Sequence, residues 1–167
     1  MNELEIAQCL QSHPLTQDHF RGVFALDELT RQNSTGFYVV NTDKRSQKGA
    51  HWVLCYLPLK GAPLYFDSYG MPPLYQEFYT FMLGSNDTFS YNMQQLQDVD
   101  SSVCGHYVLY VCSCLACGES MQDIRRRFST SNFSLNDKLI VTLFRKGFGY
   151  PIAAYKVDCT PVLSLFV

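Results

Sequence analysis

Asp100-Ser101-Ser102-Val103-Cys104-Gly105-His106-Tyr107 leads into the most apolar run of the chain, which extends from Cys104 to Gly118. The run is apolar on nearly every face of a helix, which predicts a helix over 104–117 buried at the centre of the protein. Ser101 or Ser102 is expected to cap its N-terminus. Cys104 would then lie in the first turn, where the helix dipole stabilises a thiolate.

The flanking segments predict a small sheet and several further helices. Asn2 is expected to cap the first helix, with Leu4, Ala7 and Leu10 facing inward. The expected helices cover 3–11, 74–83, 120–128 and 134–146, the expected strands cover 37–40, 51–57, 64–67 and 88–92, and an irregular tail with Pro151 and Pro161 follows. Because strands and helices are partly segregated, we expect an α+β fold with a small mixed or antiparallel sheet packed against the central helix.

Length and composition set the remaining limits. The 167 residues predict one domain over 1–167, and 47% hydrophobic with 14% aromatic residues supply a core. The net charge of −2 and a pI near 6.0 argue against a general binder of nucleic acid or of membrane surfaces. No apolar run reaches the roughly 20 residues of a membrane-spanning helix. The acidic start Met-Asn-Glu-Leu-Glu does not resemble a signal peptide, so we expect a chain that is not secreted, with reduced thiols.

Four features in chain order suggest a catalytic site. Gly49-Ala50-His51-Trp52-Val53 opens a strand with a histidine, and Tyr65-Phe66-Asp67-Ser68-Tyr69-Gly70 ends the next strand with an aspartate. Gln97 lies in a polar loop, and Cys104 begins the apolar helix. Adjacent strands would bring His51 and Asp67 to one edge of the sheet.

These residue types are those that cysteine hydrolysis requires. The thiolate of a cysteine is the nucleophile, and a neighbouring histidine can take its proton and later protonate the leaving amine. A carboxylate on the other ring nitrogen fixes the orientation of the imidazole. A glutamine amide and the backbone N–H of the cysteine can bind the oxyanion.

Each residue alone has an ordinary interpretation. His51 beside a tryptophan is more often structural, and Asp67 alone would be a turn or capping residue. Gln97 alone would be a solvated amide, with Gln94 and Gln95 as rivals for its role. Cys104 alone would be a small buried apolar residue. The joint pattern is what favours catalysis.

The order His-Trp, Asp-Ser-x-Gly, Gln, Cys-Gly resembles the adenovirus protease (adenain) and its relatives in large DNA viruses and virus-like transposons. It is also similar to the SUMO-specific proteases of the same superfamily. The resemblance covers roughly residues 35–118. Gln97 precedes Cys104 by seven residues, which is the adenain spacing. The resemblance implies an adenain-like fold with Cys104 as nucleophile, His51 as base, Asp67 as orienting acid and Gln97 as oxyanion donor, with Trp52 and Gly105 at the substrate.

The resemblance also implies a biological setting. Adenain-type enzymes cleave viral precursor proteins after glycine, in Gly-Gly-x or Gly-x-Gly sites, during virion maturation, so we expect a monomer in the virion and the host cell interior. They need no metal or organic cofactor. Adenovirus enzymes are activated by DNA and by a peptide disulfide-linked to a cysteine upstream of the nucleophile. Residues 84–103 contain no cysteine, and the pI near 6.0 is low for a DNA-activated enzyme, so both activators are in doubt.

The weaker signals have simpler explanations. The cysteines at 112, 114 and 117 lie within one apolar helix without a second pair, which favours core packing over zinc. The arginines at 125–127 are more often a solvated helix face than a DNA contact. Lys44, Arg45 and Lys48 suit an exposed loop better than a substrate groove. Two alternatives to an adenain-type peptidase remain, namely a SUMO-type or deubiquitinating isopeptidase, and a non-catalytic binding module with the same fold.

Overall fold

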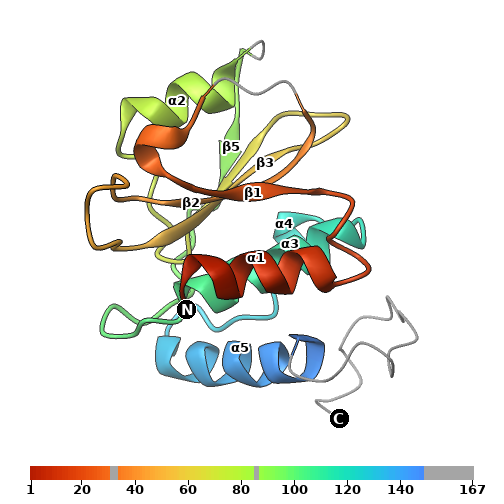
Figure 1. Cartoon of the computed structure of the whole chain (residues 1–167). Coiled ribbons are helices and arrows are strands. Elements are labelled where there is room, and N and C mark those ends of the chain that lie inside the picture. The colour runs from red at the N-terminus through yellow and green to blue at the C-terminus, as the bar shows by residue number, and fades with distance from the viewer. Residues whose placement is uncertain (31–33, 85–86, 149–167) are drawn as a thin grey trace.

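The computed structural model describes residues 1–30, 34–84 and 87–148 of the chain. Helices and strands form layers around a central sheet (Figure 1). The elements are α1 (Glu3–Ser12), β1 (Phe20–Ala25), a short 3-10 helix η1 (Leu26–Glu28), β2 (Gly36–Asn41), β3 (Trp52–Leu57), β4 (Leu64–Phe66), α2 (Gln76–Leu83), β5 (Ser90–Tyr91), α3 (Cys104–Ala116), α4 (Met121–Arg125) and α5 (Phe133–Phe148).

The sheet is mixed, and its strands follow chain order from β1 to β5. The central pairs, β2 with β3 and β3 with β4, are antiparallel. The two outer pairs, β1 with β2 and β4 with β5, are parallel. The expected α+β class with a small mixed sheet is therefore confirmed.

Both faces of the sheet are covered, which explains the unbroken apolar sequence of β2. Phe37 and Val39 point into a core shared with α1, α3 and α5, whereas Tyr38 and Val40 point into a second core under α2. This alternation is the period-2 pattern of a strand. Figure 1 shows α2 on one side of the sheet, α1 and α3 on the other, and α5 beyond α3.

Helix α3 lies between the sheet and α5, as its composition predicts. Tyr107, Val108, Leu109 and Val111 are fully buried in the core that α3 shares with β3 and α1. Cys112 is also fully buried, so core packing rather than metal binding explains it. The central position of α3 fixes Cys104, its first residue, against the sheet.

The predicted capping of the two main helices has mixed outcomes. Asn2 caps α1, and its Oδ1 accepts a hydrogen bond of 2.9 Å from the N–H of Glu5. Neither Ser101 nor Ser102 caps α3, because the residue before its first turn is Val103, which makes no capping side-chain bond. The prediction of a serine cap was therefore wrong.

The inward face of α1 was partly mispredicted. Ile6 and Leu10 are fully buried, whereas Leu4 is 72% exposed. Residues four apart lie on one helix face, so a face centred on positions 6 and 10 turns position 4 outward.

Strand β1 was missed because Arg21 and Gly22 interrupt its apolar pattern, and it forms through pairing with β2.

Other boundaries differ by a few residues. Strand β4 ends at Phe66, one residue before the predicted end, and α4 stops at Arg125 rather than 128. The predicted tail with Pro151 and Pro161 lies outside the described residues. Within the three described ranges, no helix has the length and apolarity that crossing a bilayer requires.

Candidate active site

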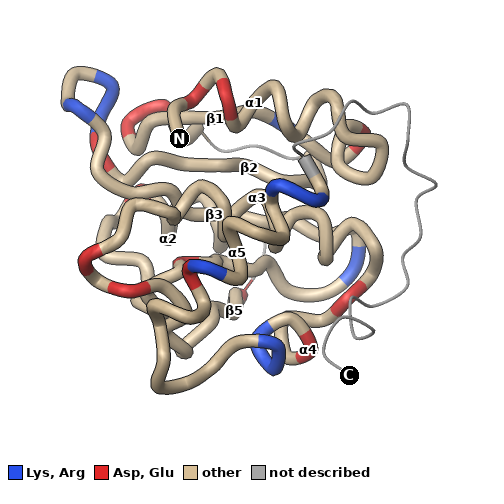
Figure 2. Tube along the Cα trace, turned by 90° about the horizontal axis from the view of Figure 1, so that it is seen from below, with Lys and Arg blue, Asp and Glu red and all other residues tan. Residues whose placement is uncertain are grey.

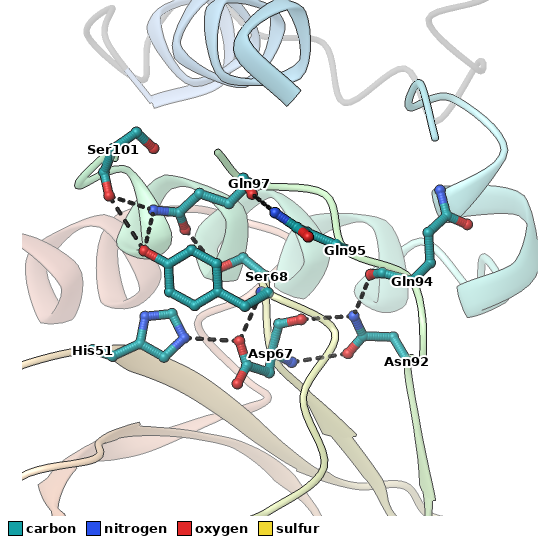
Figure 3. Close-up of polar contacts among 9 residues, drawn as sticks. His51, Asp67, Ser68, Asn92, Gln94, Gln95, Gln97 and Ser101 are labelled. Atoms are coloured by element: carbon teal, nitrogen blue, oxygen red, sulfur yellow. Dashed lines mark hydrogen bonds and ion pairs between the residues drawn. The ribbon is translucent and has the colours of Figure 1, made fainter. Parts of the chain in front are cut away.

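The antiparallel pairing of β3 and β4 brings His51 next to Asp67. Leu54 on β3 is opposite Phe66 on β4, so the residue before β3 and the residue after β4 meet at one end of the pair. His51 Nε2 lies 2.8 Å from Asp67 Oδ1, and their side chains are only 14% and 7% exposed. Figure 3 shows the two groups pointing toward each other. The predicted pairing of these two residues is therefore present in the structure.

Cys104 is the second hydrogen-bonding partner of the His51 side chain. It is the first residue of α3 and 8% exposed. Burial alone would raise the pKa of the Cys104 thiol, but hydrogen bonding to His51, the N–H groups of Trp52 and Gly105 and the charge of His51 together lower it. The N-terminal position on a helix acts in the same direction.

The pKa of His51 changes in the opposite direction to that of Cys104. Burial lowers the pKa of His51, but hydrogen bonds to Asp67 and Cys104 and the charges of both groups raise it to about 9. A raised pKa on the base and a lowered pKa on the thiol both favour an imidazolium–thiolate pair near neutral pH. Because Nε2 is bonded to Asp67, Nδ1 is the ring atom left for the sulfur.

The backbone of Asp67 is clamped by a residue that the sequence did not single out. Asn92 Nδ2 donates to the Asp67 carbonyl at 2.6 Å, and Asn92 Oδ1 accepts from the Asp67 N–H at 2.8 Å (Figure 3). Asn92 is 2% exposed. A polar residue directly after the short strand β5 is a weak signal, and nothing in the local sequence marks its partner.

Gln97 is brought to the site, in preference to its two rivals. Its side chain is fully buried, and its Nε2 donates to the Ser101 carbonyl at 2.8 Å and to the Tyr69 hydroxyl at 3.2 Å. Gln95 instead supports this loop by donating to the Gln97 carbonyl at 2.9 Å. Both amide hydrogens of Gln97 thus have acceptors, so Gln97 can donate to an oxyanion only when the oxyanion replaces one of these acceptors.

Tyr69 is a second residue that sequence reasoning missed. Its ring stacks on that of His51, with centroids 4.7 Å apart and an interplanar angle of 26°. Its N–H donates to Asp67 Oδ1 at 2.8 Å, and its hydroxyl lies 3.3 Å from the Ser101 carbonyl. Tyr69 therefore contacts His51, Asp67 and the Gln97 amide.

Trp52 and Gly105 were expected at the substrate. Trp52 Nε1 donates to the Met1 carbonyl at 3.1 Å. A Cβ added at Gly105 would lie 3.1 Å from Met1 Sδ, so this glycine accommodates the N-terminal segment. A cavity of about 270 Å³ beside Trp52 is lined in part by Lys44 and Lys48.

The basic loop between β2 and β3 extends near the start of α1, where Figure 2 shows basic and acidic residues close together. Arg45 forms ion pairs with Glu3 and Glu28 there, but residues 44–50 are all exposed, so the prediction of an exposed loop is confirmed.

The remaining candidates lie elsewhere. His106 contacts Phe144 on α5, with ring centroids 4.7 Å apart, and burial lowers its pKa. Arg127 pairs with Glu119 and donates to the Tyr110 hydroxyl, which gives it a structural role. Among the described residues, no group of three or more His, Cys, Asp or Glu is arranged to hold a metal ion.

No protein-family model matches this chain, and no curated protein matches it. The site geometry and the motif resemblance are therefore what indicate a function for this chain.

Proposed function

We propose that this chain is a cysteine endopeptidase with an adenain-like fold, which cleaves viral precursor proteins after glycine during virion maturation. The observation that carries the proposal is the arrangement around His51, with Asp67 2.8 Å from Nε2 and Cys104 bonded to the same ring. Opposite pKa changes on the thiol and the imidazole are the electrostatic requirement for a thiolate nucleophile.

The mechanism follows from these positions. The Cys104 thiolate attacks the carbonyl carbon of the scissile amide, and the carbonyl oxygen becomes an oxyanion. His51 then gives its proton to the amine as the C–N bond breaks, which leaves a thioester on Cys104. His51 next takes a proton from water, and the hydroxide attacks the thioester to release a carboxylic acid and the Cys104 thiolate, which restores the imidazolium–thiolate pair. Asp67 keeps the imidazole oriented throughout.

Gln97 supplies the oxyanion donor in this scheme. Of its two amide hydrogen bonds, that to the Tyr69 hydroxyl is the longer at 3.2 Å. The Tyr69 hydroxyl can keep the Ser101 carbonyl as its own acceptor, at 3.3 Å. An oxyanion can therefore replace the tyrosine as acceptor for Gln97 without leaving the hydroxyl unpaired.

The substrate class rests on the motif resemblance. Trp52, which follows His51 in the chain, donates from its ring to the Met1 carbonyl and packs against the core. The cavity beside Trp52 is lined by Lys44 and Lys48 but also by Glu3 and Asp43, so it gives no preference for the charge of the substrate.

The test is a map of cysteine reactivity combined with a cleavage assay. The native protein is treated briefly with iodoacetamide near pH 6, where ordinary thiols are almost wholly protonated, and all seven cysteines are analysed by mass spectrometry. We expect selective labelling of Cys104 that is lost in His51→Ala, and cleavage of Gly-Gly-x peptides that is lost in Cys104→Ala. Labelling spread over other cysteines, or turnover by Cys104→Ala, would refute the assignment.

A further inference from the structure

The loop after β4 contains a buried hydroxyl that the mechanism above does not use. Ser68 is fully buried, and its Oγ donates a 2.6 Å hydrogen bond to Oε1 of Gln97 (Figure 3). The backbone carbonyl of Ser68 also accepts from the N–H groups of Leu96 and Gln97, at 2.9 and 3.0 Å. Ser68 therefore holds Gln97 at both its backbone and its side chain.

The orientation of the Gln97 amide is determined by what lies on its two sides. The Ser101 carbonyl, 2.8 Å from Nε2, can only accept a hydrogen bond. Turning the amide by 180° would bring Oε1 against this carbonyl with no hydrogen between the two oxygens. The Ser68 hydroxyl on the opposite side donates to Oε1 in the observed orientation. Both contacts therefore direct the NH₂ group of Gln97 toward Tyr69 and Ser101.

We propose that Ser68 is a positioning residue, whose hydroxyl fixes and polarises the Gln97 amide as the oxyanion donor. This inference rests on the proposed peptidase function. A hydrogen bond into Oε1 draws electron density from the amide and strengthens its N–H groups as donors, because linked hydrogen bonds polarise one another. Removing the hydroxyl leaves Oε1 buried without a donor and lets the amide move, which misplaces Nε2 during oxyanion formation.

The position of Ser68 next to Asp67 demands an assay that separates two effects. Loss of the hydroxyl could act through Gln97 or through the orientation of His51. Iodoacetamide labelling of Cys104 reports the imidazolium–thiolate pair and involves no oxyanion. Peptide turnover and binding of a peptide aldehyde do involve one, because the aldehyde forms a tetrahedral adduct on the thiolate.

The experiment compares Ser68→Ala, Gln97→Ala and the double variant with wild type. The probes are a fluorogenic peptide amide ending in Gly-Gly and the aldehyde of the same peptide. We expect Gln97→Ala to lower kcat about 10²–10³-fold, as for loss of an oxyanion donor, and Ser68→Ala to lower it about tenfold with little change in KM. The double variant should be no slower than Gln97→Ala. Aldehyde affinity should fall in parallel with kcat, while the labelling rate of Cys104 stays that of wild type.

Thr16→Val is the matched control for a lost buried hydroxyl. Thr16 is fully buried, and its Oγ1 donates to the Leu10 carbonyl at 2.8 Å, away from the site. The melting temperature of Thr16→Val should fall about as much as that of Ser68→Ala, but its kcat should equal that of wild type.

Three results would overturn the inference. The first is wild-type kcat in Ser68→Ala, and the second is an equal loss of kcat in the wild-type and Gln97→Ala backgrounds. The third is a fall in Cys104 labelling as large as the fall in kcat, which would trace the effect to His51. If Cys104→Ala abolishes turnover while any of these holds, the peptidase proposal stands and the role of Ser68 is wrong. A wild-type protein that neither turns over the peptide nor binds the aldehyde would refute both.

Discussion

Replacing Asp67 by asparagine removes one charge from the site and keeps the shape of the side chain. The pKa of His51 lies near 9 instead of the ordinary 6.5, a difference worth about 3 kcal/mol. Burial acts against this rise, and Asp67 and Cys104 together produce it. Asp67 outranks Cys104 in both the hydrogen-bond and the charge contribution, so at least half of the rise comes from the aspartate, and Asp67→Asn should weaken the imidazolium–thiolate pair by ~1.5 kcal/mol, about tenfold in the equilibrium constant for proton transfer from Cys104 to His51.

The assay is the rate of iodoacetamide labelling of Cys104 near pH 8, which lies between the ordinary pKa of histidine and the raised pKa of His51. We expect a rate several-fold below wild type, with kcat reduced at least as much, because the imidazolium that stabilises the thiolate is less populated and a lost carboxylate also leaves the imidazole free to turn. Asp123→Asn is the control, because it removes the same charge from an exposed pair with Arg126 on α4. A labelling rate in Asp67→Asn equal to that of wild type would show that Asp67 does not set the charge state of His51.

Three further predictions concern the site and its support. The pH profile of kcat/KM should rise in acid as Cys104 loses its proton below its ordinary pKa and fall as His51 deprotonates at about 9; a profile still rising at pH 10 would contradict the ion pair. Asn92→Ala should lower the free energy of unfolding by about 1–3 kcal/mol, because a buried N–H and carbonyl lose their partner, and chemical denaturation measures this. Gly70→Ala should lower the melting temperature, because its φ is +71° and the added Cβ would lie within 2.6 Å of the backbone of 94–95; an unchanged midpoint would refute this.

The sequence predicted the parts of the fold that local pattern determines. The apolar run after Cys104 predicted a buried central helix, and β-branched and aromatic residues predicted β2 and β3. The pairing of β3 with β4 then followed from their short connection. Strand β1 was missed because its pattern is broken, and its extended form depends on pairing with β2.

The residues of the candidate site also divide into those that the local sequence predicts and those that it does not. His51, Asp67 and Cys104 could be named because their order and residue types match a known chemistry, and the structure brings them together. Asn92 and Tyr69 could not be named, because their roles arise from contacts across the fold. Asn92 bonds to a backbone 25 positions earlier in the chain. No local pattern encodes such a contact.

Residues 67–69 place three successive side chains against the same two residues of the candidate site, His51 and Gln97. Asp67 bonds to His51, Ser68 to Gln97, and Tyr69 to both, through its ring and its hydroxyl. In the proposed mechanism, this one loop therefore positions both the base and the oxyanion donor. A displacement of this segment by about one ångström would misplace His51 and Gln97 together and slow the reaction. A side-chain substitution can weaken the base or the oxyanion donor alone, whereas a change in the backbone of residues 67–69 weakens both together.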